Sequence, residues 1–248
     1  MSTREKVPSP EPEPKPSVEN IVDAAAAVAF ALGDKVPYAL VGGGACSVLG
    51  SQRLTEDIDI VVPRGRTSEA RQLLREHPEY FDVERRTLHT YFKSEPGRVL
   101  VEILAPPAMF REEYDETTPT IRMLDDKVRV LQPTLLLNAK CGSVQNRRSE
   151  DKKKSDALDI LFLLEWCYRH EIFPTADEVP NASEGLVRTF VSLFPCTEHW
   201  INAGYDLVRV SCNLSLYLLH GQLFFFVARG VVDGSPYYSS PLCAAMCC

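Results

Sequence analysis

The stretch YALVGGGACSVLG, residues 38–50, followed by RLTEDIDIVV, residues 53–62, decides the fold of this chain. An apolar run that leads into three glycines and a second apolar segment predicts a strand over 38–41, a tight turn and a short helix over 45–49. Acids alternate with β-branched residues up to Pro63, which predicts a strand over 57–62. Strand, turn, helix and strand in this order indicate an α/β (α+β) fold.

Asp57 and Asp59 are the first candidate site residues. Side chains two positions apart on a strand share a face, and like charges so close repel unless a cation lies between them. Ile58 and Ile60 mark the opposite face as buried. Oxygen ligands of this kind suit Mg²⁺ or Mn²⁺, although an ordinary solvated strand face would show the same alternation.

The three glycines are the second candidate feature. Gly42, Gly43 and Gly44 allow the backbone to approach phosphates, and N–H groups at a helix start favour an anion. A glycine-rich turn is more often only a turn, so the acids fifteen residues later supply the context.

Glu102 is an acid within the apolar run VLVEIL, residues 99–104. It is a candidate third metal ligand or general base, with a salt-bridged glutamate as the alternative.

Outward from this centre, the patterns predict a helix from Ser17 to Leu32, a helix over 67–76 and strands over 81–85, 89–92, 98–104 and 128–131. Pro133 opens a further helix, residues 146–154 form a charged loop, and a last helix covers 155–169. We therefore divide the chain into a disordered proline-rich tail (1–17), an α/β core (18–131), a mostly helical part (132–204) and an apolar, cysteine-containing tail (205–248).

Composition narrows the possible partners. The chain has 45% hydrophobic and 25% charged residues, as soluble globular proteins do, and its net charge of -7 gives no strong footprint for nucleic acid. Eight cysteines without paired spacing and the lack of a signal-like start predict an intracellular, cytoplasmic protein. His220, Gln222 and Arg229 interrupt the apolar stretch 214–232, so we expect a packed segment there and no membrane span.

These residues resemble a known family. The stretch from Val41 to Gly44, Gly50 and the run Arg53-x-Thr55-x-Asp57-Ile58-Asp59 look like the signature of the nucleotidyltransferase (polymerase-beta-like) superfamily. The branch most similar to them contains the AbiEii-type toxins and related small nucleotidyltransferases. Further motifs of that branch are matched by residues of the helical part: Pro133, Lys140, Arg147, Arg148 and the run 154–160. Together the resemblance covers about residues 36 to 165.

The resemblance implies a nucleotidyltransferase fold, with a mixed sheet flanked by helices, and a set of roles. Asp57, Asp59 and Glu102 would ligate the metal, and Gly42, Gly43 and Gly44 would position an NTP. Lys140, Lys154, Asp156 and Asp159 would contact the nucleotide or tune the site. The chain departs from the family pattern where Ala45 follows the glycines and where Ser155, not lysine, precedes Asp156.

The expected function is transfer of a nucleoside monophosphate from an NTP to a hydroxyl of tRNA, protein or a small molecule, with release of pyrophosphate. The alternative from another class is a catalytically inactive nucleotide-binding or interaction module with the same fold. Two mutually repelling acids favour the enzyme, since a decayed site has no reason to keep them. A protein that only binds a structural cation would bind metal without NTP.

Overall fold

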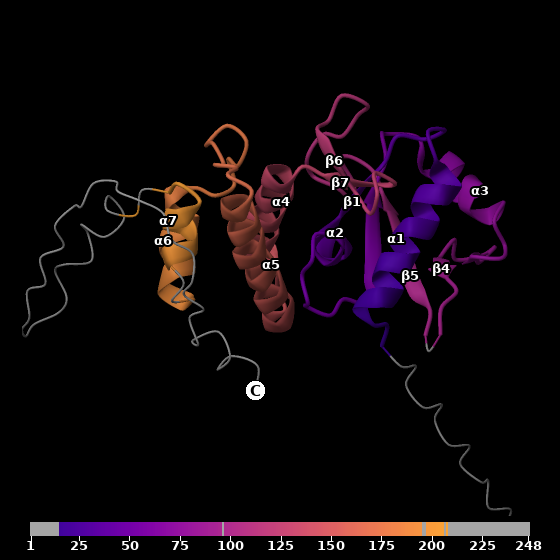
Figure 1. Ribbon diagram of the computed structural model, residues 1–248, viewed down its shortest axis with the longest axis horizontal. Coiled ribbons are helices and arrows are strands. Elements are labelled where there is room, and N and C mark those ends of the chain that lie inside the picture. The colour runs from indigo at the N-terminus through magenta and orange to yellow at the C-terminus, as the bar shows by residue number, and fades with distance from the viewer. Residues whose placement is uncertain (1–14, 96, 195–196, 206, 208–248) are drawn as a thin grey trace, which may run out of the picture. The chain divides into compact units, whose positions relative to one another are not determined.

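The computed structural model describes residues 15–95, 97–194, 197–205 and 207, which all belong to one compact unit. Most of both predicted tails, including the apolar stretch 214–232, therefore lies outside the described residues. The elements are α1 (Val18–Leu32), β1 (Ala39–Val41), α2 (Gly42–Val48), β2 (Asp57–Val61), α3 (Thr67–Arg75), β3 (Phe81–Val83), β4 (Thr90–Phe92), β5 (Val99–Leu104), β6 (Thr120–Met123), β7 (Val128–Leu131), α4 (Pro133–Asn146), α5 (Glu150–Arg169), α6 (Glu184–Leu193) and α7 (Thr197–Asn202) (Figure 1).

A seven-stranded mixed sheet forms the centre, in the order β3-β4-β5-β2-β1-β7-β6. β2 runs parallel to β5 and antiparallel to β1, while β1 runs parallel to β7. This confirms the predicted mixed α/β architecture. Strand β6 was not predicted, because its four residues form a short edge strand and the turn to β7 contains neither glycine nor proline.

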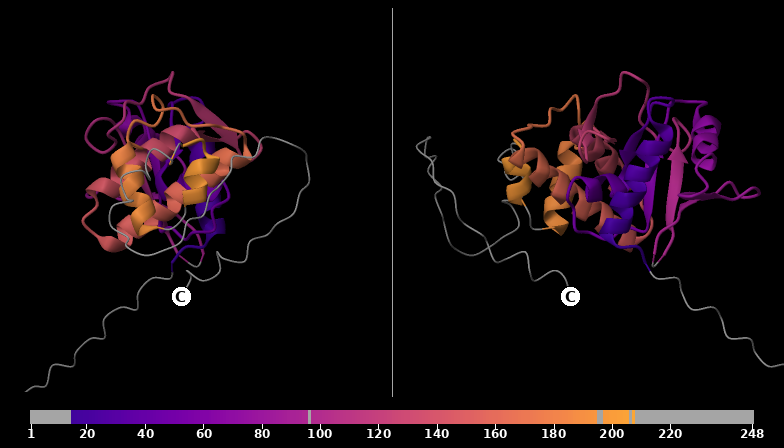
Figure 2. Two further views of the ribbon diagram at one scale, coloured as in Figure 1. Left: turned by 90° about the vertical axis from the view of Figure 1, so that its left-hand side faces the viewer. Right: turned by 45° about the vertical axis from the view of Figure 1, so that its right-hand side comes forward.

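Helices α1, α2 and α3 pack against the sheet, and α1 also contacts both α2 and α3 (Figure 2). α1 begins as predicted, since the Ser17 side chain accepts a hydrogen bond from the N–H of Asn20 and the Asn20 side chain accepts one in return. The alternation in β2 is also as predicted. Ile58 and Ile60 are fully buried, whereas Asp57 and Asp59 are half-buried on the other face.

Two helix starts differ from the prediction. α2 begins at Gly42, not Ala45, because Gly43 and Gly44 continue in helical geometry after the positive φ of Gly42, so the glycines form its first turn. α5 begins at Glu150, not Ser155. The Ser149 side chain accepts a hydrogen bond from Lys152 N, and two acids in the first turn suit the helix dipole. Most of the predicted charged loop is therefore the start of α5.

The part after β7 is helical, as predicted. α4 and α5 lie side by side, and α5 also contacts α7 (Figure 1). The Trp200 ring of α7 is fully buried and packs edge-on against Phe190 and Tyr205. In the part of the chain that the structure describes, no helix combines the length and the apolar character needed to cross a membrane.

Candidate active site

A cavity of about 880 Å³ opens between the acidic face of the sheet and helix α4. The sheet contributes Asp57, Asp59 and Glu102 to its lining, and α4 contributes Lys140. Its volume lies within the range of small-molecule and cofactor pockets. Asp57 and Lys140 are 83 positions apart in the sequence, yet both line this cavity.

The three predicted carboxylates lie together on adjacent strands. Asp59 stands directly opposite Glu102 in the parallel pair of β2 and β5, and Asp57 precedes Asp59 on the same face. Burial raises the pKa of Asp59 to about 7, and the neighbouring charges of Asp57 and Glu102 add to the rise, while Lys140 opposes it. Thr55 Oγ1 donates a hydrogen bond of 3.0 Å to Asp57 Oδ1. The sheet therefore concentrates negative charge at one wall of the cavity.

Carboxylate oxygens are hard donors of the kind that Mg²⁺ prefers, so Asp57, Asp59 and Glu102 are the residues that could hold a metal ion. Within the described ranges, no group of three or more His, Cys, Asp or Glu side chains forms a ready-made metal cage. Burial is the main cause of the raised pKa of Asp59, and the nearby charges of Asp57 and Glu102 add to it. A cation at this wall would relieve the repulsion between these charges.

At each of the three glycine positions, a Cβ atom would come too close to a neighbouring side chain. A Cβ atom on Gly42, whose φ is +66°, would collide with the Asp59 carboxylate. On Gly43 it would lie 2.5 Å from Arg53 Nη2, and on Gly44 2.9 Å from Ile58 Cγ2. Gly42 lines the cavity, whereas Gly43 and Gly44 do not. The latter two hold α2 tightly against β2 and the loop before it.

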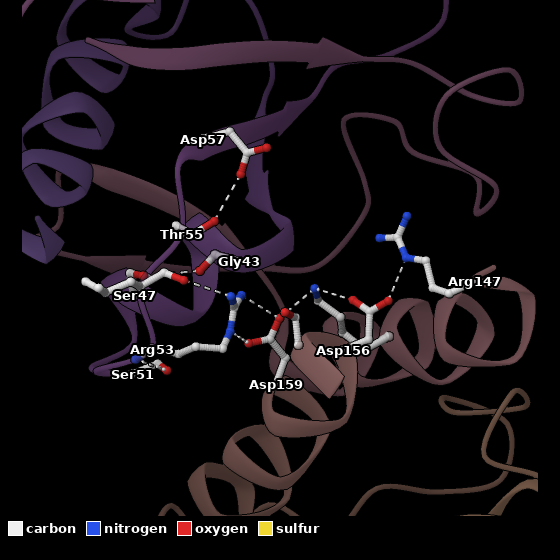
Figure 3. A network of polar contacts seen from close by, with 12 residues as sticks. Gly43, Ser47, Ser51, Arg53, Thr55, Asp57, Arg147, Asp156 and Asp159 are labelled. Atoms are coloured by element: carbon white, nitrogen blue, oxygen red, sulfur yellow. Dashed lines mark hydrogen bonds and ion pairs between the residues drawn. The ribbon is translucent and has the colours of Figure 1, made fainter. Parts of the chain in front are cut away.

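A chain of ion pairs, buried at its two aspartates and partly exposed at its two arginines, joins that loop to α4 and α5 (Figure 3). Arg53 binds Asp159 through two hydrogen bonds, of 2.6 Å from Nε and 3.0 Å from Nη2. Lys140 Nζ lies 2.7 Å from Asp159 Oδ2 and 3.0 Å from Asp156 Oδ1. Arg147 Nε lies 2.8 Å from Asp156 Oδ2. We call these five residues the ion-pair chain.

The ion-pair chain divides the predicted nucleotide-binding residues into two kinds. Lys140 lines the cavity, but Asp156 and Asp159 are buried behind it and line no part of it. Burial disfavours the charged form of Lys140, yet Asp159 and Asp156 outweigh burial, so its pKa lies above the ordinary lysine value. The two aspartates thus hold the Lys140 ammonium in place from behind the cavity wall.

Lys154 lies apart from the cavity. It is exposed on α5 and is not among the lining residues, whereas Lys152, one half-turn earlier, is. Sequence reasoning also missed the lining residues Arg111, Asn138 and Asn181. Their signal in the sequence is weak, because single polar residues in a loop or on a helix carry no spacing that marks a site.

Comparison with solved structures identifies the fold. An antigenic nucleotidyltransferase-like protein from Paracoccidioides brasiliensis matches with a TM-score of 0.57 and 25% identity, over 75% of this chain and 93% of that one. The antibiotic-resistance factor ANT(2'')-Ia matches with a TM-score of 0.43 and 15% identity, over 72% and 95%. Terminal uridylyl transferase 4 from Trypanosoma brucei with bound GTP gives 0.31 and 15%, over 73% and 67%.

The first of these similarities shows that the chain has the nucleotidyltransferase fold, as predicted. No protein-family model matches the sequence, and no curated protein is significantly similar to it. Placement in the branch of the AbiEii-type toxins therefore stays a prediction.

Proposed function

We propose that this protein is a metal-dependent nucleotidyltransferase that transfers a nucleoside monophosphate from an NTP to a hydroxyl acceptor and releases pyrophosphate. The observation that carries the proposal is the placement of Asp57, Asp59 and Glu102 at one wall of the cavity, with the Lys140 ammonium in the same space. The similarity to a nucleotidyltransferase-like protein supports transfer of a nucleotidyl group as the kind of reaction.

Asp57 and Asp59, with Glu102 as third ligand, would hold Mg²⁺ or Mn²⁺. Mg²⁺ usually binds through one or two carboxylates and keeps waters and substrate phosphates as its other ligands, so it needs no cage made only of protein. An ion held by these carboxylates would supply neutralisation of the charge on the phosphates and activation of the acceptor hydroxyl. The fit of the site rests on its oxygen donors, which share one wall of the cavity; burial, with the charges of Asp57 and Glu102, raises the pKa of Asp59 to about 7.

In the proposed reaction, the acceptor oxygen forms a bond to the α-phosphorus, and the bond from that phosphorus to the bridging oxygen breaks. Pyrophosphate leaves with the electron pair, and the hydroxyl proton passes to a carboxylate, for which Glu102 is the candidate. Catalysis then depends chiefly on positioning and on charge neutralisation.

The cations of the cavity suit the triphosphate. Lys140 is held by Asp156 and Asp159, so its ammonium needs little reorganisation when an anion arrives. Arg147 is bound to Asp156 through Nε, and Lys152 lines the cavity near its exposed side. Gly42 at the start of α2 lines the same cavity, and its missing Cβ atom leaves room for the Asp59 carboxylate.

The acceptor class stays open between tRNA, a protein side chain and a small molecule. The net charge of -7 favours an acceptor that is held locally over a long nucleic acid. The rival function is an inactive nucleotide-binding module, and the departure of Ser155 from the family pattern is the observation that favours it.

The deciding experiment incubates purified protein and Mg²⁺ with each α-labelled NTP, together with tRNA, a protein extract or a small-molecule fraction. The double variant Asp57→Asn/Asp59→Asn serves as the test of the site, and Asp82→Asn, an exposed acid of β3, as the matched control. Label transfer that only the double variant loses supports the proposal and identifies the acceptor class. NTP binding without transfer by the wild type establishes the inactive module instead.

A further inference from the structure

Helix α4 presents two different stripes to the cavity. Residues three or four positions apart share one side of a helix. Lys140 on the helix and Arg147, the residue that directly follows the helix, form a cationic stripe. A second stripe, the amide stripe, carries no charge; its members are Asn138, Gly142, Gln145 and Asn146. Asn138 and Lys140 are only two positions apart, which places the stripes on different sides of the helix. One wall therefore offers cations in one region and neutral hydrogen-bonding groups in another.

Asn181, from the segment between α5 and α6, is fixed to the amide stripe. Its backbone N–H donates to Asn138 Oδ1 over 2.9 Å, and its Nδ2 donates to the Asn138 carbonyl over 3.2 Å. Gln145 Nε2 donates to the Asn181 carbonyl over 3.4 Å. A Cβ atom on Gly142 would lie only 2.8 Å from Asn181 Nδ2, so glycine makes room for this contact.

These bonds determine which amide atoms remain available. Because a backbone N–H can only donate, the Asn138 atom that it meets must be the oxygen, which leaves Nδ2 as a donor. Among the described residues, Asn138 Nδ2 has no hydrogen-bond partner, and neither does Asn181 Oδ1. Asn138 is only 6% exposed, and both residues line the cavity. Asn138 Nδ2 is not among the unpaired side-chain atoms of the described residues that are shut off from solvent, so this donor is open to the cavity and available to a ligand.

We infer that Asn138 and Asn181 read the nucleobase of the NTP, with Asn138 Nδ2 as the donor and Asn181 Oδ1 as the acceptor. The inference rests on the proposed function, because it assigns a role within the same nucleotide site. Every nucleobase presents a donor beside an acceptor on its pairing edge, which complements such a pair of amide groups. The preference for one base over another then depends on how well the donor and acceptor of its pairing edge align with Asn138 Nδ2 and Asn181 Oδ1.

The two stripes on the α4 side of the cavity together favour a nucleotide, and not the acceptor, as the ligand that binds there. An NTP is anionic at one end and neutral but rich in hydrogen-bonding groups at the other, and α4 offers a matching pair of stripes. Lys140 belongs to the cationic stripe and acts electrostatically on Asp59, so that stripe faces the carboxylates. The amide stripe is left for the uncharged end of the same molecule.

The first experiment uses the wild-type protein alone. With Mg²⁺ present, calorimetry measures the affinity for the four NTPs, for ribose 5′-triphosphate without a base and for tripolyphosphate. A base read by two hydrogen bonds makes the preferred NTP bind at least about tenfold more tightly than the baseless triphosphate. Equal affinities for these ligands overturn the inference and leave the phosphate site intact. If no NTP and no tripolyphosphate binds, the proposed function fails as well.

The second experiment changes the donor. Asn138→Asp keeps an oxygen that accepts from the Asn181 N–H but replaces the Nδ2 donor with an acceptor, so the order of the four NTP affinities changes. Asn202→Asp adds the same charge to an exposed residue of α7 that does not line the cavity, and it leaves the order of the four affinities unchanged. An unchanged order in Asn138→Asp overturns the inference. A change only in the KM for the acceptor also overturns it and assigns the amide pair to the acceptor.

Discussion

The carboxylate of Asp59 occupies the space where a Cβ atom of residue 42 would stand. The first residue of α2 and the central acid of β2 are thus in direct contact, and the φ of Gly42 is +66°. A side chain at position 42 would displace the carboxylate that is proposed to bind the metal. Two constraints therefore require glycine at position 42: the space that the Asp59 carboxylate occupies and the positive φ.

We expect Gly42→Ala to destabilise the fold by about 2–3 kcal/mol, through collision and a strained φ, and to abolish NTP binding. Thermal unfolding and calorimetry with Mg-NTP measure the two effects. The control is Gly185→Ala in α6, where a Cβ atom would meet nothing within 4 Å. That change should leave stability equal or slightly higher, because alanine favours a helix. An alanine at position 42 that binds NTP normally would contradict the assigned contact.

Asp59→Asn should stabilise the metal-free protein at high pH. The pKa of Asp59 is about 7 in the folded chain and ordinary in the unfolded one. The folded state therefore binds the proton more tightly, and stability falls as pH rises from about 4 to 7. The amide cannot ionise, so the variant should gain about 2–4 kcal/mol at pH 8 and little at pH 4. Unfolding in EDTA measures this, with Asp82→Asn as the control; equal gains at both pH values would refute it.

Asp159→Asn should cost about 3–5 kcal/mol of stability, because it leaves Arg53 without its buried counter-charge and Lys140 with Asp156 alone. Glu165→Gln is the matched control, since it breaks an ion pair with Arg169 in the same helix at the surface. Surface pairs contribute little, so this variant should unfold at nearly the wild-type denaturant concentration. Equal small effects of the two changes would show that the ion-pair chain does not support the fold.

Lys152→Ala and Lys154→Ala remove equal charges two positions apart on α5, but only Lys152 lines the cavity. We expect Lys152→Ala to weaken Mg-NTP binding about two- to fivefold at low salt, and Lys154→Ala to weaken it less. Calorimetry at two salt concentrations measures the difference, which should shrink as salt screens it. Similar losses in both variants would point to a diffuse charge effect.

The sequence alone predicted the elements whose patterns are local. The glycine run, the alternation of Asp57 to Ile60 and the apolar run around Glu102 each carry a periodicity, and the structure places strands at both acid-bearing runs. The cap at Ser17 and Pro133 at the start of α4 were also readable. The edge strand β6 and the early start of α5 were not, because neither is marked by a strong apolar repeat.

What the sequence by itself determined is thus the order of strands and helices and the acids that share a face, because these patterns are local. Only the tertiary structure decided which side chains reach the cavity. Asp156 and Asp159 share a helix with Lys152, yet packing of α5 against α4 buries them behind Lys140. The partner of Asp159 is Arg53, 106 residues earlier, and the partner of Asn138 is Asn181, 43 residues later. Such pairs depend on how whole elements pack, which no local pattern encodes.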